Sequence, residues 1–311
     1  MIHDMHLFSG SSHPQLSKSI AKELGRELGN VTLKAFSCGE RYVRYEESVR
    51  GDEVYIVQTG TLQSDRDLME LFLLCQAAKL SFASTVHVIL PHFPYARQDR
   101  VAAPREPISA KLISHLLEEA GADHVVTLNL HSEQIQGFFS IPVDALSANH
   151  LLCEAIAKRK LQNVTVIAPD IGSAKDAKKF ADMLAAPLAV LHKSRPAHQK
   201  VEILNVVGDV EGRTCVIFDD MIDTAGTLVS AKNALMKRGA NKDVYAAAVH
   251  AIFSGPAIER MRKAKFKEII VTDTIPQKPW KGLTILSCAP LLAEVIEHVE
   301  SHRSVTEIYK K

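Results

Sequence analysis

Two adjacent carboxylates stand at the end of an apolar run in the second half of the chain. Val216-Ile217-Phe218 precedes Asp219 and Asp220, and residues 223–227 follow with small and hydroxyl side chains. The apolar run predicts a buried strand, and open α/β sheets bind ligands at the carboxyl ends of their strands. Small residues before a helix let backbone N–H groups approach a phosphate. The carboxylates would repel that phosphate, and they suit sugar hydroxyls or a bridging Mg²⁺ instead.

The same residues have a plainer interpretation. Asp223 or Thr224 would serve as an ordinary helix N-cap, and the two acids would be unremarkable strand-end residues. For an isolated Asp-Asp pair this second interpretation is the better one. The complete order of strand, small-residue loop and helix from Cys215 to Thr227 favours binding of a sugar phosphate.

Polar residues also follow two other apolar stretches. His131 comes after residues 125–130 and Asp170 comes after residues 164–168, so both are expected at carboxyl ends of strands. A lone His at such a place is more often structural than a metal ligand. Arg97 and Gln98 combine a planar cation with an amide, which suits a polyphosphate and a base edge but equally a surface loop.

Lys193 and Arg195 alternate just before Pro196. On an extended segment, alternate side chains emerge on the same side. Two cations aimed together would stabilise charge that spreads over a transferring phosphoryl group. A solvated hairpin tip has the same pattern, so the residues alone leave both interpretations open.

The elements that would position these residues alternate between strands and helices. Short apolar runs predict strands at 54–57, 86–90, 125–128, 164–168, 216–218 and 245–250. Longer amphipathic stretches predict helices at 67–79, 108–119, 150–158, 174–184 and 227–238. This alternation predicts parallel sheets with helices on both faces. The first and second halves follow a similar rhythm, and the stretch 142–147 is the expected boundary between two domains.

Composition narrows the functional class. The chain has 311 residues, of which 46% are hydrophobic and 23% charged, enough for two globular cores. Lys plus Arg number 37 against 36 Asp plus Glu, a balance that argues against a general nucleic-acid binder but leaves binding of a small phosphorylated ligand open. No apolar run approaches the ~18 residues of a membrane span, and no signal peptide is recognisable. Five scattered cysteines without a Cys-x-x-Cys motif predict reduced thiols and a cytoplasmic protein without a membrane partner.

The stretch from Asp219 to Thr227 resembles the phosphoribosyl-diphosphate loop shared by phosphoribosyltransferases and ribose-phosphate diphosphokinases. Four more segments resemble the diphosphokinases alone: PYARQDR at 94–100, NLHSEQIQGFF at 129–139, PDIG at 169–172 and KSRP at 193–196. The resemblance extends from Leu7 to the region of Ser304. The chain is most similar to the phosphate-regulated type of diphosphokinase, which is found in bacteria and animals.

That resemblance implies an α/β fold of two similar phosphoribosyltransferase-like domains, each a mainly parallel sheet flanked by helices. Residues 1–147 would form the ATP-side domain, and residues 148–311 would carry the ribose-5-phosphate-binding loop. The implied reaction transfers the diphosphoryl group of ATP to the C1 hydroxyl of ribose 5-phosphate, giving 5-phosphoribosyl 1-diphosphate and AMP for nucleotide biosynthesis. The family also implies Mg²⁺, phosphate and ADP as effectors, and a homohexamer in which one subunit lends its Phe36 loop to a neighbour's ATP.

The resemblance further implies a role for each candidate residue. The residues expected on ATP are Phe36, Cys38, Gly39, Glu40, Arg97 and Gln98. Those expected on ribose 5-phosphate are Arg195, Asp219, Asp220, Asp223, Thr224, Ala225, Gly226 and Thr227. His131 and Asp170 would hold Mg²⁺. Lys193 and Arg195 would stabilise the transition state.

The chain departs from the family pattern at three places. Cys38 stands where an Asp usually binds the base, which bears on nucleotide choice. Asp176 stands where a basic residue is common, so we expect its carboxylate to point away or to pair with Lys175 or Lys179. Residues 101–104 lack two or so of the cations found in phosphate-regulated members, each contact being worth roughly 1.5–3 kcal/mol.

These departures leave an alternative function, a catalytically weak regulatory subunit of a true synthase. The intact segments around Asp219 and Lys193 favour the enzyme. A phosphoribosyltransferase has no use for the segments around Arg97, His131 and Lys193, and it would consume the product of the diphosphokinase.

Overall fold

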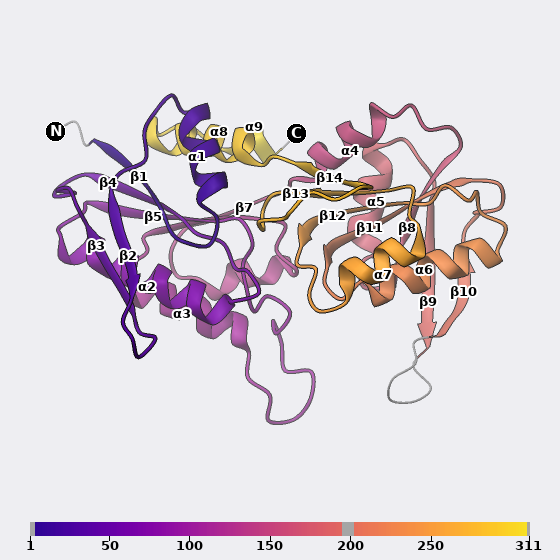
Figure 1. Ribbon diagram of the computed structural model, residues 1–311, viewed down its shortest axis with the longest axis horizontal. Coiled ribbons are helices and arrows are strands. Elements are labelled where there is room, and N and C mark those ends of the chain that lie inside the picture. Colours follow the sequence, from indigo (N-terminus) through magenta and orange to yellow (C-terminus); the bar gives the residue numbers. More distant parts are fainter. Residues whose placement is uncertain (1–3, 195–201, 310–311) are drawn as a thin grey trace. The chain divides into compact units, whose positions relative to one another are not determined.

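The computed structural model describes residues 4–194 and 202–309 (Figure 1). The chain forms two compact units, and each has its own sheet. Unit 1 comprises residues 1–147, 274–276 and 287–311, and unit 2 comprises residues 148–273 and 277–286. The units therefore differ from the expected domains at the carboxyl end. Helix α8 (Ala289–Glu300) belongs to unit 1 because its buried apolar side packs on helix α1 (Pro14–Glu23).

Unit 1 is built on a wholly parallel sheet of order β1-β4-β5-β6-β7. Its strands are β1 (Met5–Ser9), β4 (Glu53–Val57), β5 (Thr85–Leu90), β6 (His124–Leu128) and β7 (Val143–Leu146). Helices α2 (Ser64–Leu80) and α3 (Ser109–Glu119) cover one face, and α1 and α8 cover the other (Figure 1). Because both faces are covered, the central strands β4, β5 and β6 are mainly apolar and almost fully buried, as predicted from their sequences.

A two-stranded hairpin packs beside this sheet. Strands β2 (Val31–Ala35) and β3 (Arg41–Tyr45) pair antiparallel, and β3 lies against α2. The loop 36–40 connects the two strands, so the position of this loop depends on how the hairpin is held. A short 3-10 helix η1 (Glu133–Phe138) and a last helix α9 (Thr306–Tyr309) complete the unit.

Unit 2 is built on a seven-stranded sheet of order β10-β9-β8-β11-β12-β13-β14. Its strands are β8 (Val164–Ala168), β9 (Leu188–Ser194), β10 (Glu202–Val207), β11 (Thr214–Ile222), β12 (Tyr245–Ala251), β13 (Glu268–Thr272) and β14 (Leu283–Leu286). All neighbouring strands are parallel except β9 and β10. The helices are α4 (Asn149–Ala157), α5 (Ala174–Met183), α6 (Gly226–Lys237) and α7 (Ala257–Ala264).

The predicted fold class, α/β with mainly parallel sheets flanked by helices, is confirmed by both units. Within the described ranges, no helix has both the length and the apolar character needed to cross a bilayer.

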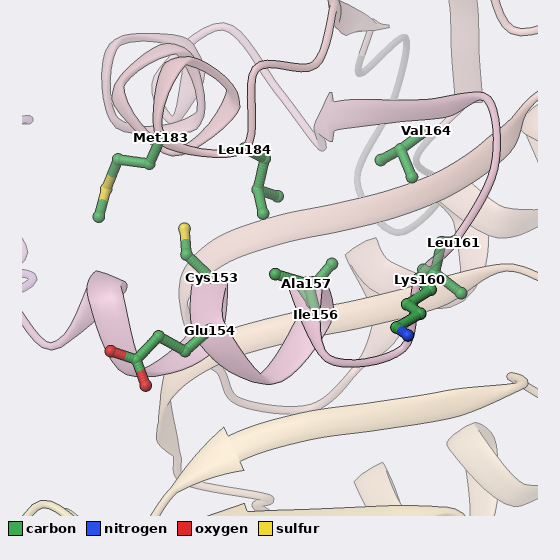
Figure 2. A pocket seen from close by; sticks show the side chains of 9 residues that line it. All are labelled: Cys153, Glu154, Ile156, Ala157, Lys160, Leu161, Val164, Met183 and Leu184. Carbon is green, nitrogen blue, oxygen red and sulfur yellow. The ribbon is translucent and has the colours of Figure 1, made fainter.

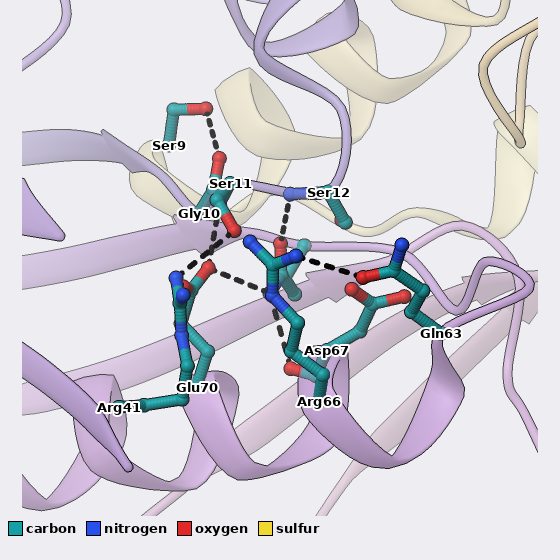
Figure 3. A network of polar contacts seen from close by, with 10 residues as sticks. Ser9, Gly10, Ser11, Ser12, Arg41, Gln63, Arg66, Asp67 and Glu70 are labelled. Atoms are coloured by element: carbon teal, nitrogen blue, oxygen red, sulfur yellow. Dashed lines mark hydrogen bonds and ion pairs between the residues drawn. The ribbon is translucent and has the colours of Figure 1, made fainter. Parts of the chain in front are cut away.

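A buried polar network joins four segments of unit 1 (Figure 3). Glu70 of α2 is fully buried and pairs with Arg41, the first residue of β3, whose side chain is 9% exposed. Glu70 Oε1 also accepts hydrogen bonds from the backbone N–H of Ser11 at 2.6 Å and from Gln58 Nε2 at 3.1 Å. The network therefore fastens the hairpin with loop 36–40 to α2 and to the segment after β1.

Three aromatic side chains from neighbouring strands lie side by side on the face of this sheet that is opposite to α2. Tyr55 stacks on His87 with ring centroids 4.3 Å apart, and His87 Nδ1 lies 3.0 Å from His124 Nδ1. His124 Nε2 in turn lies 3.1 Å from Asp144 Oδ2. Burial, then repulsion from His124 and Lys79, lowers the pKa of His87 to about 3. Glu53 Oε2 lies 3.6 Å from His87 Nε2 but already accepts from the Tyr55 hydroxyl, and burial outweighs its attraction.

We expect this histidine to make unit 1 sensitive to acid. Its folded-state pKa lies below the ordinary 6.5, so the unfolded chain binds the proton more tightly, and stability falls as pH drops from about 6.5 toward 3. The loss is about 1.4 kcal/mol for each pH unit. His87→Asn should flatten this dependence in urea titrations between pH 7.5 and 5. His115→Asn, an exposed position on α3, should keep the wild-type slope, and equal slopes for all three proteins would contradict the assignment.

Candidate active site

The expected strand, loop and helix around Asp219 are present in unit 2. Strand β11 extends to Ile222, so Asp219 and Asp220 lie within it near its carboxyl end. Ala225 adopts a left-handed conformation with φ 58°, and α6 starts at Gly226. The sharp turn at Ala225 thus directs the chain from the sheet edge into the helix N-terminus, where backbone N–H groups lack helical partners.

Three carboxylates gather at this edge of the sheet. Asp170 follows β8, which is the neighbour of β11, and its Oδ1 accepts from the Ser173 backbone N–H at 3.1 Å. Burial raises the pKa of Asp219 well above its ordinary value, and the negative charges of Asp220 and Asp170 raise it further. A cation or sugar hydroxyls placed here would relieve that repulsion.

Carboxylates such as those at this edge of unit 2 suit a divalent ion that is shared with a substrate. In residues 4–194 and 202–309, no three His, Cys, Asp or Glu side chains are grouped as a metal-binding cluster. Mg²⁺ commonly uses only one or two protein carboxylates together with substrate phosphates and waters, so a complete protein cage is not required. Of the two residues expected to bind Mg²⁺, Asp170 lies at this edge of unit 2, and His131 follows β6 in unit 1.

Two residues from the segment after β12 brace the loop. The Ser254 hydroxyl donates to Asp223 Oδ1, and Arg260 Nη1 of α7 donates to the Thr224 carbonyl at 3.1 Å. Sequence reasoning missed both residues because they lie about thirty positions beyond the loop. The order of the strands could have revealed them. Strand β12 pairs in parallel with β11, so the segment after β12 must begin at the same edge of the sheet as loop 223–225.

The expected adenine loop forms the tip of the β2–β3 hairpin. The Phe36 N–H donates to the Glu40 carbonyl and the Gly39 N–H to the Phe36 carbonyl, both at 2.8 Å. Gly39 has φ 97°, a conformation that favours glycine. The Phe36 ring is 54% exposed and contacts Tyr42 edge-on, and Cys38 is also exposed. The turn therefore holds an aromatic ring at the surface of unit 1.

Arg97, Gln98 and His131 follow neighbouring strands of unit 1. Arg97 and Gln98 lie between β5 and α3, and the Gln98 side chain accepts from the Ser109 hydroxyl. His131 follows β6, which pairs in parallel with β5, so the two segments share one edge of the sheet. All three side chains are exposed, as a substrate site requires.

Lys193 lies in β9, whose partner β10 runs antiparallel, so its backbone is extended as expected. Its side chain, and Arg195 as a whole, lie outside the described residues.

The expectation for Asp176 is confirmed, because its carboxylate lies 3.5 Å from Lys179 Nζ on the exposed face of α5.

Unit 2 also contains a pocket of about 340 Å³ away from these residues (Figure 2). It is lined by Cys153, Glu154, Ile156, Ala157, Lys160, Leu161, Val164, Met183 and Leu184. Val164 begins β8, whereas Asp170 follows its other end. The pocket therefore lies at the amino end of that strand, opposite the candidate site.

Known proteins resemble the chain over nearly its full length. The model of the N-terminal domain of ribose phosphate pyrophosphokinase matches residues 5–121, and that of the phosphoribosyl synthetase-associated domain matches residues 193–310. A ribose-phosphate pyrophosphokinase from Oceanobacillus iheyensis is 44% identical, over 98% of this chain and 97% of its own. The chain belongs to the ribose-phosphate pyrophosphokinase family.

Two further relatives support this assignment to the family. A ribose-phosphate pyrophosphokinase from Bacillus subtilis is 42% identical over 98% of this chain and 97% of its own. The crystal structure of phosphoribosylpyrophosphate synthetase from Mycobacterium smegmatis matches with a TM-score of 0.91 at 42% identity, over 96% of this chain and 99% of the other. Both halves of the chain therefore have the fold of ribose-phosphate pyrophosphokinases.

Proposed function

We propose that this chain is an ATP-dependent ribose-phosphate diphosphokinase. It transfers the diphosphoryl group of ATP to the C1 hydroxyl of ribose 5-phosphate and releases 5-phosphoribosyl 1-diphosphate and AMP. The observation that carries the proposal is the acid-bearing end of β11 followed directly by loop 223–225 and the N-terminus of α6. This arrangement suits a sugar that carries a phosphate, because the acids bind hydroxyls and the helix N-terminus binds the anion.

The two parts of the chain have different tasks in this proposal. Residues 1–147 bind ATP, with Phe36 and Glu40 on the adenine and Arg97 with Gln98 on the nucleotide. Residues 148–311 bind ribose 5-phosphate. His131 and Asp170 would hold Mg²⁺, which would supply positive charge to the ATP phosphates.

In the reaction, the C1 oxygen forms a bond to the β-phosphorus of ATP, while the bond from that phosphorus to the α-phosphate oxygen breaks. AMP leaves with the bonding electron pair, and the C1 hydroxyl loses its proton. Asp219 and Asp220 orient the ribose hydroxyls for this attack. Lys193 and Arg195 stabilise the charge that spreads over the transferred group.

Homohexamer formation, with the Phe36 loop of one subunit at the ATP of its neighbour, belongs to the same proposal. So do a cytoplasmic location and phosphate and ADP as effectors. The exposure of the Phe36 ring supports a role for the loop outside its own hairpin.

Chromatography of the nucleotides tests the reaction type. Purified protein with ATP, Mg²⁺ and ribose 5-phosphate should yield AMP in proportion to the sugar consumed. Formation of ADP would show transfer of a single phosphoryl group and would contradict the proposal. Absence of turnover until a homologous synthase is added would instead indicate a regulatory subunit.

Asp223→Ala should mainly raise the KM for ribose 5-phosphate. The change removes a loop carboxylate and leaves the Ser254 hydroxyl without its acceptor, which loosens the loop that holds the 5-phosphate. Steady-state kinetics with each substrate varied in turn will measure it. Asp182→Ala, on the exposed pair with Lys178, is the matched control and should behave as wild type. An effect of Asp223→Ala confined to ATP would contradict the loop assignment.

A further inference from the structure

The loop proposed to hold the 5-phosphate has no positive charge of its own. Residues 223–227 contain one acid and no Lys or Arg, and Asp219 and Asp220 lie just before them. A phosphate monoester carries about −1.5 to −2 charges at pH 7. Backbone N–H groups alone would have to overcome the repulsion between this anion and the nearby carboxylates. A cation from another element would remove that difficulty.

Arg260 reaches the loop from α7. Its Nη1 donates to the Thr224 carbonyl at 3.1 Å. A Cβ built on Gly226 would lie 3.7 Å from the same Nη1 and 3.7 Å from Thr224 Oγ1. The guanidinium therefore lies within van der Waals reach of the first residue of α6, near the N–H groups that would receive the phosphate.

Among the described residues, no carboxylate neutralises the charge of this guanidinium. Within the described part of the chain, the only hydrogen bond of Arg260 is the one to the neutral Thr224 carbonyl, and no carboxylate lies within ion-pair distance. Arg159 in the same unit shows the contrasting case, since Glu268 neutralises it. Arg260 is also exposed, so a ligand in solution has access to its remaining N–H donors.

We propose that Arg260 binds the 5-phosphate of ribose 5-phosphate, an inference that rests on the proposed function. A guanidinium presents five N–H donors in a rigid fork that matches phosphate oxygens. The Thr224 carbonyl accepts from one of these donors and keeps the guanidinium close to the N-terminus of α6. Arg260 supplies the positive charge that loop 223–227 lacks, and it makes the site select a phosphorylated sugar.

Kinetics of three variants test this role. Arg260→Gln keeps a hydrogen-bond donor but removes the charge, and we expect the KM for ribose 5-phosphate to rise at least about tenfold, as for a lost charge-assisted contact. The KM for ATP and the melting temperature should stay near wild type. Arg260→Lys keeps the charge without the fork and should restore part of the affinity. Lys263→Gln removes an exposed cation from the same helix and should change nothing.

A wild-type KM for ribose 5-phosphate in both Arg260→Gln and Arg260→Lys would overturn the inference. Equal rises in the KM values for ATP and ribose 5-phosphate, without rescue by lysine, would also overturn it, because they indicate a structural role. Failure of the proposed function is distinguishable, since the wild-type protein would then form no AMP from ATP and ribose 5-phosphate.

Discussion

Lys193→Ala is expected to lower turnover at least ~100-fold while leaving ATP affinity nearly intact. The family resemblance assigns this lysine to the transition state, and removal of one preorganised charge from a reacting group has an effect of that size. A ground-state contact to ATP would instead change the KM for ATP. The backbone at Lys193 is extended, because this residue lies in β9 next to its last residue, Ser194.

The measurement is steady-state kinetics together with equilibrium binding of ATP. Lys178→Ala is the control, because that lysine belongs to the same unit and makes only a solvent-exposed pair with Asp182. Unchanged turnover in Lys193→Ala would remove the residue from the mechanism. A large loss of ATP affinity with normal turnover would move it to nucleotide binding.

The second large effect concerns the network around Glu70. Glu70→Ala should lower the free energy of unfolding by about 3–5 kcal/mol, because it leaves the Arg41 guanidinium in a site with little water, with only the attraction of the nearby Asp67 carboxylate in place of its ion pair. Arg41 Nε already lacks a hydrogen-bond partner among the described residues, so the pair with Glu70 is its main compensation. Urea denaturation followed by circular dichroism will measure the loss.

Arg44→Ala provides the matched control, since Arg44 belongs to the same strand but pairs with Glu46 at the surface. Exposed pairs contribute little, so this variant should unfold as wild type does. Replacing both buried partners, as Arg41→Met with Glu70→Leu, should recover much of the stability. A stability loss in Glu70→Ala no larger than that in Arg44→Ala would refute the account of the network.

Much of the fold was predictable because strands covered on both faces leave a clear pattern. Val164–Ala168 matches β8 at both ends, and the apolar stretches at 86–90 and 125–128 are the cores of β5 and β6. Strand β11 is longer than predicted, because Asp219 and Asp220 interrupt the apolar run without ending the backbone pairing to β12. A prediction based on apolar runs therefore ends a strand too early where charged residues continue the backbone pairing.

The place of the last helix was not predictable from its own sequence. An amphipathic pattern in α8 predicts that one side is buried but does not say against which partner, and α1 from the start of the chain provides it. Sequence reasoning also missed Arg41 with Glu70, because an ion pair between residues 29 positions apart depends on how the hairpin meets α2. Ser254 and Arg260 were missed for the same reason, since only the sheet order brings them to loop 223–227.

The central claim is the transfer of a diphosphoryl group to the anomeric hydroxyl of ribose 5-phosphate. The most direct measurement is ³¹P NMR of purified protein with ATP, Mg²⁺ and ribose 5-phosphate. The account predicts that ATP signals are replaced by those of AMP and of a sugar-linked diphosphate, and that both substrates are required. Unchanged spectra at low and at high free phosphate would contradict the claim.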